Sequence, residues 1–223
     1  MTKVSKGDFI EVEYTGRLKE DNLVFDTTEE SIAKEAGIHS ENMTYGPVII
    51  CLGERQLLEG LEEELDGKEE GKEYTIELAP EKGFGKKDAK LIRMIPFNSF
   101  KKQNIMPQPG MQVNIDGLMG IIKTAAGGRC LVDFNHPLAG KEVVYTIKVN
   151  KIVTDDKEKI KSYIELSLNL KDASVDVKEG KAEIKTKKDI PKEIQDKLVE
   201  NMKELIPSVQ GYSFKVEEKS TTK

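Results

Sequence analysis

A stretch in the middle of the chain, residues 86–135, has a different residue pattern from the sequence on either side of it. Three prolines punctuate its first half, and short strand candidates follow at 111–115, 118–123 and 129–134. An Asp116-Gly117 step between the first two candidates is typical of a tight β-hairpin turn. Longer strand and helix patterns flank the stretch on both sides. We therefore predict a small β unit inserted into another domain, which the chain leaves and later re-enters.

The flanking sequence carries strand patterns. Residues 9–15 place Ile10, Val12 and Tyr14 on one face and polar residues on the other, as in a half-buried strand. Further strands are predicted in "GPVIICLG", "EYTIELAP" and "VVYTIKVNKIV". Together with the helices described next, these strands predict an α+β fold.

Two short helices are expected in the same part of the chain. Thr27 followed three residues later by Glu30 fits a capping box, so a helix is predicted from there to Gly37. A second helix is predicted from an amphipathic leucine stripe at Leu57, Leu58, Leu61 and Leu65.

The last part of the chain predicts a domain with the element order α-β-β-α-β. A hairpin is expected about Glu179-Gly180, and a helix from Pro191 carries the stripe Ile194, Leu198, Met202 and Leu205. That stripe either packs on the domain's own sheet or is shared across a dimer. We predict three domains: 1–87 with 136–153, 88–135, and 154–223.

Composition excludes several classes of protein. There are 35 Lys and Arg against 40 Asp and Glu, a net charge of −5 that disfavours nucleic-acid binding. The N-terminal residues lack the apolar run of a signal peptide, and no segment has the 18 apolar residues of a membrane span. Cys51 and Cys130 each lie in an apolar run, so we expect two buried thiols in a reducing compartment, the cytoplasm.

A search for catalytic constellations returns few candidates. The chain has two histidines, no Cys-x-x-Cys and no His-x-x-x-His, so no metal or other cofactor is expected. Rotation about an Xaa–Pro bond needs none of these groups. Its barrier of roughly 20 kcal/mol comes from amide resonance, and a pocket that binds the twisted amide better than the planar one lowers it.

Several motifs resemble the FKBP-type peptidyl-prolyl isomerases: "VFDTT", then "GPVIICLGERQLLEGLEEEL", then "APEKGFGK". The return through "FNHPLAGKEVVYTIKV" resembles the SlyD-like branch, in which an insert-in-flap chaperone domain interrupts the fold. The helix after Phe25-Asp26 and the C-terminal α-β-β-α-β domain resemble long-chain archaeal members. The resemblance rests on motifs over 1–153 and on architecture alone over 154–223. It implies an antiparallel sheet wrapped on a short helix, interrupted by a small β-barrel-like insert.

The resemblance also implies a pocket for the proline ring. Its catalytic residues would be Asp26, Tyr14, Phe84 and Tyr145. Its substrate-binding residues would be Phe25, Val48, Leu57, Leu58, Leu61 and Leu138. Asp26 is then the polar group facing the substrate, and Leu61 is the floor. Each apolar member taken alone is also consistent with core packing, and Asp26 with a cap on the following helix.

Two positions depart from the family pattern. Many members have Trp where Leu61 stands and Tyr where Phe84 stands. Leu61 implies a shallower floor and weak binding of the family's macrolide inhibitors. Phe84 lacks a hydroxyl that would hydrogen-bond a substrate carbonyl, a bond that contributes roughly 0.5–1.5 kcal/mol. The metal-binding tail of some SlyD proteins is absent from the sequence.

For the insert, the resemblance implies a surface that holds unfolded polypeptides containing Xaa–Pro bonds. Flexible and apolar side chains suit varied partners, and the candidates are Met106, Leu118, Met119 and Ile121. The alternative is that these residues fill a small β core. A second hypothesis for the whole chain is a holdase chaperone with a weak or vestigial isomerase site. The resemblance also favours a homodimer through the C-terminal domain.

His136 lies beside Asp133 and Asn135 in "VDFNHPLAG", where the chain leaves the insert. Such a cluster is compatible with a base or a metal ligand. Its position favours instead a hydrogen-bonding residue that fixes the junction.

Overall fold

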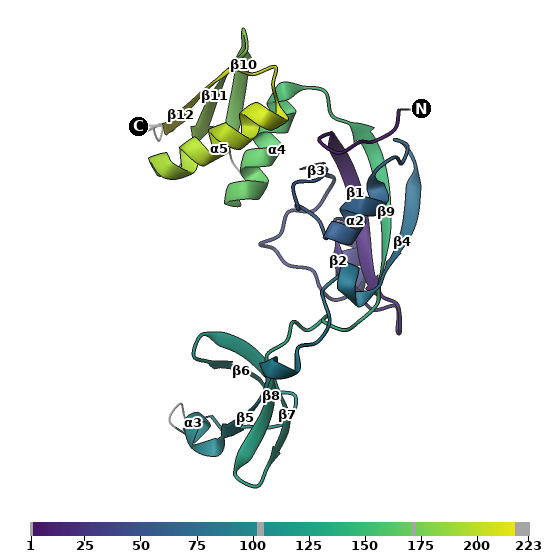
Figure 1. The fold of residues 1–223 in the computed structure, drawn as a ribbon, viewed down its shortest axis with the longest axis vertical. Helices are drawn as coiled ribbons and strands as arrows, with labels where there is room; N and C mark the ends of the chain where they lie inside the picture. The colour runs from purple at the N-terminus through teal and green to yellow at the C-terminus, as the bar shows by residue number, and fades with distance from the viewer. Residues whose placement is uncertain (1, 102–104, 171–172, 217–223) are drawn as a thin grey trace. The chain divides into compact units, whose positions relative to one another are not determined.

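The computed structural model describes residues 2–101, 105–170 and 173–216. The chain divides into two units (Figure 1). The first joins Met1–Glu77 to Val144–Lys223, and the second is the intervening Leu78–Val143. Both units combine β-sheets with few helices, so the predicted α+β class is confirmed. The finer division into three domains remains a prediction.

The first unit is built around a five-stranded sheet whose strands pair in the order β2-β1-β9-β4, with β3 also on β1. The strands are β1 (Phe9–Leu18), β2 (Val24–Thr27), β3 (Val48–Cys51), β4 (Glu73–Leu78) and β9 (Val143–Ile152). One edge of β1 pairs with two strands, β3 and β2, along different parts of its length. Its first half pairs with β3 from Phe9 to Val12, and its second half pairs with β2 from Thr15 to Arg17.

Two short helices accompany this sheet, α1 (Glu30–Glu35) and α2 (Glu59–Leu65). The predicted capping box at the start of α1 is wrong. The helix begins after Glu29, and no side chain caps it. The Thr27 hydroxyl accepts the N–H of Glu29, the residue before the helix, at 3.1 Å, and it lies 2.8 Å from the hydroxyl of Thr15 across the β1–β2 pair. It is thus engaged by a local turn and a cross-strand contact, and neither it nor Asp26 caps the helix.

The C-terminal part of the first unit runs α4 (Asp156–Leu168), β10 (Ser174–Lys178), β11 (Lys181–Thr186), α5 (Lys192–Leu205) and β12 (Gly211–Val216). Strand β11 lies between an antiparallel β10 and a parallel β12. Glu179 and Gly180 both have positive φ, 50° and 70°, as the primed turns that close hairpins require. The predicted hairpin forms at this point.

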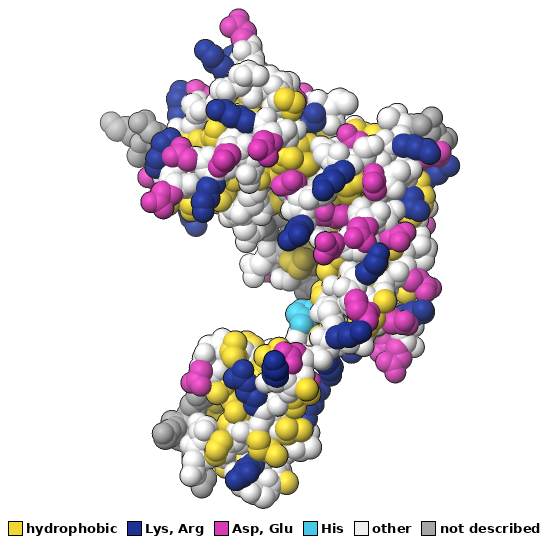
Figure 2. Space-filling model, in the orientation of Figure 1, with side chains coloured by type: hydrophobic (Ala, Val, Ile, Leu, Met, Phe, Trp, Pro, Cys, Tyr) yellow, Lys and Arg dark blue, Asp and Glu magenta, His cyan; other side chains and the backbone are white. Residues whose placement is uncertain are grey.

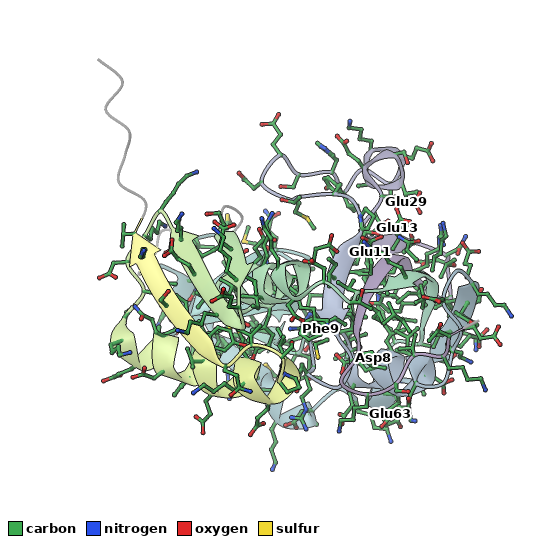
Figure 3. All side chains as sticks on the ribbon, turned by 90° about the horizontal axis from the view of Figure 1, so that it is seen from above. Asp8, Phe9, Glu11, Glu13, Glu29 and Glu63 are labelled. Carbon is green, nitrogen blue, oxygen red and sulfur yellow. The ribbon has the colours of Figure 1, made fainter. Side chains whose placement is uncertain are left out.

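Most of the α5 stripe packs inside the chain, while Ile194 at its start is 40% exposed. Leu198 and Met202 belong to a core that also contains Ile160, Ile164 and Ile184. Phe9 and Cys51, from β1 and β3, are part of the same core, and Figure 3 shows Phe9 on the side of the sheet that faces the C-terminal segment. Leu198 and Met202 therefore follow the first of the two alternatives, and the five-stranded sheet contributes to this core.

The second unit is a four-stranded sheet with the order β5-β8-β7-β6. Its strands are β5 (Ile92–Pro96), β6 (Gln112–Ile115), β7 (Leu118–Ala126) and β8 (Arg129–Asp133), with α3 (Phe97–Lys101) after β5. This path has two ends, so among the described residues the sheet is open rather than barrel-like. Phe100, Val113, Ile122, Cys130 and Val132 form its core. At the predicted hairpin turn, Asp116 and Gly117 both have positive φ.

Candidate active site

Four of the predicted pocket residues come together in the first unit. Phe25 and Asp26 lie on β2, and Tyr14 and Tyr145 lie on β1 and β9. The ring centroids of Tyr14 and Tyr145 are 6.0 Å apart. The Phe25 ring meets Tyr145 edge-on at 5.7 Å between centroids. Three aromatic rings and one carboxylate thus share a small region of the sheet.

Gly16 brings two of these rings onto the backbone of β1. It is the direct cross-strand partner of Asp26. A Cβ atom at this position would lie 2.8 Å from both Phe25 Cζ and Tyr145 Cε1, closer than real Cβ atoms come. We did not select Gly16 from the sequence. The available signal was a glycine inside an otherwise alternating strand, which marks a close approach to the backbone.

Asp26 is held in a partly desolvated position. Burial raises the pKa of its carboxyl group above the ordinary value, and hydrogen bonds from the Tyr14 hydroxyl and the Thr27 backbone N–H oppose that rise. The pKa of Tyr14 is raised as well, by burial first and then by the charge and hydrogen bond of Asp26. Burial, followed by the charge of Asp26, also raises the pKa of Tyr145. Both phenols therefore stay protonated and can donate.

The backbone of Tyr14 is fixed by the two threonines that follow Asp26. Its N–H donates to the Thr28 hydroxyl at 2.9 Å, and its carbonyl accepts from the Thr28 N–H, also at 2.9 Å. The Thr27 hydroxyl donates to the same carbonyl at 3.2 Å. The "DTT" segment therefore positions the tyrosine that hydrogen-bonds Asp26, a role we did not assign to it from the sequence.

The remaining candidates of the first unit lie on α2 and β3. Leu61 is 1% exposed, as either a pocket floor or a core residue would be. Leu57 and Leu58 are half-buried and lie immediately before α2, so the helix is shorter than the leucine stripe. Val48, also half-buried, is the first residue of β3.

The segment before α2 is organised by a buried carboxylate. Glu62 is 7% exposed and accepts backbone N–H bonds from Gly53 at 2.9 Å, Arg55 at 3.2 Å and Leu57 at 2.9 Å. Arg55 adopts a positive φ of 55°, which a non-glycine residue keeps only when its surroundings enforce it. The three bonds supply that enforcement and fix the position of Leu57.

Replacing Glu62 by alanine should therefore lower the free energy of unfolding by about 3 kcal/mol, because three backbone donors lose a charged acceptor. Urea titration followed by circular dichroism measures the change. Glu64→Ala is the matched control, since Glu64 is exposed on the same helix and should change stability by less than about 0.5 kcal/mol. Equal effects of the two substitutions would show that the Glu62 bonds do not stabilise the loop.

Phe84 and Leu138 lie in the second unit, so their assignment to the pocket remains a prediction. The Phe84 ring stacks on His136, with centroids 4.9 Å apart and planes 2° apart. Nδ1 of His136 accepts the N–H of Leu138 at 3.2 Å.

Asp133 does not pair with His136. Its carboxylate accepts from the side chain and the backbone of Asn135, at 2.8 and 3.0 Å, and forms an ion pair with Lys87 at 3.3 Å. Burial opposes ionisation, but these hydrogen bonds prevail and hold the pKa of Asp133 below its ordinary value. The contacts of His136 thus follow the junction hypothesis and not a His-Asp catalytic pair.

The insert exposes much of its apolar surface. Met106, Leu118 and Met119 are 81%, 47% and 51% exposed, so the alternative that they fill the core is wrong for these three. Ile121 is half-buried.

Two exposed residues of the insert were missed from the sequence, Ile92 and Met94 on β5. Strand pairing aligns Met94 with Leu131, and Ile92 and Ile121 with Asp133. One face of the sheet therefore carries an apolar set, here called the outer face: Ile92, Met94, Met119, Ile121 and Leu131. Figure 2 shows hydrophobic side chains gathered on this unit.

Within the described ranges, no group of three or more His, Cys, Asp or Glu side chains is placed to hold a metal ion. None of the helices in those ranges has the length and apolarity that a membrane crossing requires.

Comparison with known proteins gives concordant matches. A family model described as "FKBP26, IF domain" matches residues 93–138. The chain is 38% identical over 155 residues to a short-type peptidyl-prolyl cis-trans isomerase of Methanocaldococcus jannaschii. The matched region is 70% of this chain and 98% of that protein. It is 35% identical to an FKBP-type 16 kDa isomerase of Escherichia coli, over 48% of this chain and 74% of that one. An FKBP-type SlyD isomerase of Vibrio cholerae is 28% identical to this chain, over 58% of this chain and 66% of the SlyD chain.

Proposed function

Because the chain belongs to the FKBP-type peptidyl-prolyl cis-trans isomerases, we propose that it isomerises Xaa–Pro bonds of unfolded and partly folded polypeptides at the site around Asp26. The observation that carries the proposal is the partly desolvated Asp26 carboxylate, hydrogen-bonded by Tyr14 and adjoined by the rings of Phe25 and Tyr145.

The reaction at this site is non-covalent. Planar Xaa–Pro amides resist rotation because the nitrogen lone pair is delocalised into the carbonyl. As the bond twists, that delocalisation is lost and the carbonyl carbon becomes more positive. A carboxylate fixed nearby in a low-dielectric site stabilises the twisted form more than the planar form. The aromatic rings hold the proline ring, while Leu57, Leu58, Leu61 and Val48 complete the apolar surface.

A role of Phe84 and Leu138 in substrate binding is proposed from the family resemblance alone. Because Phe84 offers no hydroxyl and Leu61 replaces a larger aromatic floor, macrolide inhibitors of the family should bind weakly.

We further propose that the insert is the chaperone part of the molecule. The outer face, with Met106 and Leu118, offers adaptable apolar contacts to unfolded chains. A client held on the insert experiences a raised concentration at the isomerase site, as in any linked pair of binding modules. The competing proposal is a holdase whose isomerase site is weak or vestigial.

An assay with two clients tests these proposals. Protease-coupled or NMR exchange measurements should show catalysed isomerisation of an Xaa–Pro tetrapeptide. Light scattering should show suppressed aggregation of a proline-free client. Suppression without catalysis would support the holdase, and catalysis without suppression would remove the chaperone role.

We also propose a cytoplasmic location and retain the homodimer as a proposal. The first is supported by two buried free thiols, Cys51 and Cys130. For the second, Leu198 and Met202 of the α5 stripe are already part of the core of the chain. This leaves Ile194, at the start of the stripe, and Val216 as apolar contact points, 40% and 50% exposed. Light scattering separates a monomer of 25.0 kDa from a species of twice that mass.

A further inference from the structure

The second unit is basic, whereas the chain as a whole is acidic. Residues 78–143 contain ten Lys and Arg against five Asp and Glu, which leaves 25 against 35 for the rest of the chain. The formal charge is therefore +5 for this unit and −10 for the remainder, which together make the −5 of the whole. An anionic partner that the whole chain would repel is thus attracted to this unit at close range, within a Debye length of about 8 Å at physiological ionic strength.

The strands of the second sheet carry the same bias. Asp133 is the only acidic residue in β5, β6, β7 and β8 as the structure describes them, against the cations Arg93, Lys123 and Arg129. The Asp133 carboxylate is 7% exposed and already forms an ion pair with Lys87 at 3.3 Å, so its charge is compensated within the unit. On the face shown in Figure 2, Lys and Arg side chains (dark blue) lie among the hydrophobic ones of this unit.

Strand alternation places one of these cations on the outer face. Cys130 and Val132 are 0% exposed and belong to the core of the insert. Arg129 and Leu131 alternate with them along β8, so they point to the other side of the sheet. Arg129 is exposed and is the first residue of β8. It therefore lies at the end of the outer face, next to the position where Leu131 pairs with Met94.

We propose that the outer face binds polypeptide segments in which apolar side chains are flanked by Asp or Glu. The inference rests on the proposed client-holding role of the insert and names the class of client. Met94, Met119 and Leu131 would contact the apolar side chains. Arg129 would pair with a flanking carboxylate through the two parallel hydrogen bonds that a guanidinium group forms with a carboxylate. The other cations of the unit would speed the encounter more than they hold the bound segment.

A single-stranded nucleic acid is the other anionic polymer that a basic sheet attracts, but this face lacks the groups that bind bases. Proteins of that class stack bases on exposed aromatic side chains. The five members of the outer face are aliphatic residues and methionines, and the aromatic rings of the insert, Phe97, Phe100 and Phe134, pack in or against its core. The exposed chemistry therefore favours an acidic polypeptide.

Fluorescence anisotropy on the full-length protein tests the proposal with three labelled peptides. The peptides share one apolar, proline-free core and are flanked by Glu, Ser or Lys, and the absence of proline keeps the isomerase site out of the measurement. We expect the Kd of the Glu-flanked peptide to be about tenfold lower than that of the Ser-flanked one at low salt. The Lys-flanked peptide should bind most weakly. The preference should shrink to about twofold near 1 M salt, because salt screens exposed charges.

Variants assign the preference to the face. Arg129→Gln should remove most of the preference and leave the Kd of the Ser-flanked peptide within about twofold, and Arg129→Glu should favour the Lys-flanked peptide over the Glu-flanked one. Lys197→Glu is the control for net charge, since Lys197 is exposed on α5 of the first unit, and it should preserve the order of the three peptides. Met119→Ser should weaken all three alike.

Three results would overturn the proposal, and they differ in what else they remove. If the three peptides bind equally and Met119→Ser weakens them all, the insert holds clients without selecting their charge. If no peptide binds, or Met119→Ser changes nothing, the client-holding role falls as well. If a single-stranded oligonucleotide binds more tightly than any peptide and Arg129→Glu abolishes its binding, the face is a nucleic-acid surface.

Discussion

Replacing Asp26 by alanine should lower kcat/KM for Xaa–Pro tetrapeptides by about 30-fold, which corresponds to about 2 kcal/mol of transition-state stabilisation. The carboxylate is the charged group of the aromatic cluster, and its effect on the twisted amide is strengthened by its partial burial. Asp26→Asn keeps the shape and removes the charge, so it should lose nearly as much activity.

The matched control is Asp21→Asn. Asp21 is exposed in the turn between β1 and β2 and caps the Leu23 N–H through its side-chain oxygen, a bond that asparagine preserves. Its activity should equal that of the original protein. Full activity of Asp26→Asn would show that the charge does not contribute to catalysis.

The same carboxylate should reduce stability at neutral pH. Burial raises the pKa of Asp26 in the folded protein, so the folded state binds more protons than the unfolded state between the ordinary and the raised pKa. Stability contributed by this group is therefore present at low pH and declines as pH rises through that window. Asp26→Asn should unfold at the same or a higher temperature than the original protein at pH 7, and this difference should vanish below the ordinary carboxyl pKa of 3.8. A lower melting temperature at pH 7 would contradict the assignment.

Removing the insert should separate the two proposed activities. Ile92 and Asp133 are cross-strand partners, so deletion of residues 93–132 leaves two ends that an Asn-Gly turn can join. The shortened protein keeps Phe84, Asn135 and His136. It should isomerise a tetrapeptide within about threefold of the original rate, yet catalyse refolding of a proline-limited protein about 100-fold more slowly, because the client is no longer held near the site.

Point substitutions refine this test without removing the unit. Met94→Lys and Met119→Lys place charges on the outer face and should weaken client binding in the same direction as the deletion. Leu23→Lys is the control, because Leu23 is equally exposed at 56% but belongs to the first unit. Equal loss of tetrapeptide and protein-refolding activity in the deletion variant would refute the proposal that client binding depends on the insert and isomerisation does not.

Local chemistry made much of the fold predictable. The alternation in 143–149 became the buried and partly exposed faces of β9, and the Asp116-Gly117 and Glu179-Gly180 steps became turns with positive φ. These features depend on residues that are close in sequence, and the pattern of such residues directly favours a strand or a turn. The cluster of Tyr14, Phe25, Asp26 and Tyr145 was also named from the sequence, but through family resemblance.

Features that depend on distant partners were missed. Thr27 satisfied the pattern of a helix cap, yet its hydroxyl binds Thr15 on another strand. Glu62 lies in a run of three glutamates that predicts a solvated face, and only the returning loop at Gly53–Leu57 gives it a buried role. Strand β5 escaped notice because Pro96 ends it and its apolar residues face outward. In each case the deciding contact joins residues that the sequence pattern does not relate.

The order of strands in the first sheet also has a consequence for how the molecule is made. Strand β1 pairs with β9, whose residues leave the ribosome only after the whole of β5 to β8 has been synthesised. The second sheet needs no partner outside Ile92–Asp133, and contacts close in sequence form faster than distant ones. During translation, the insert should therefore complete its sheet and expose its outer face to solvent before β1 and β9 can pair. A nascent molecule would then expose the proposed client-binding surface while the proposed isomerase site was still unassembled.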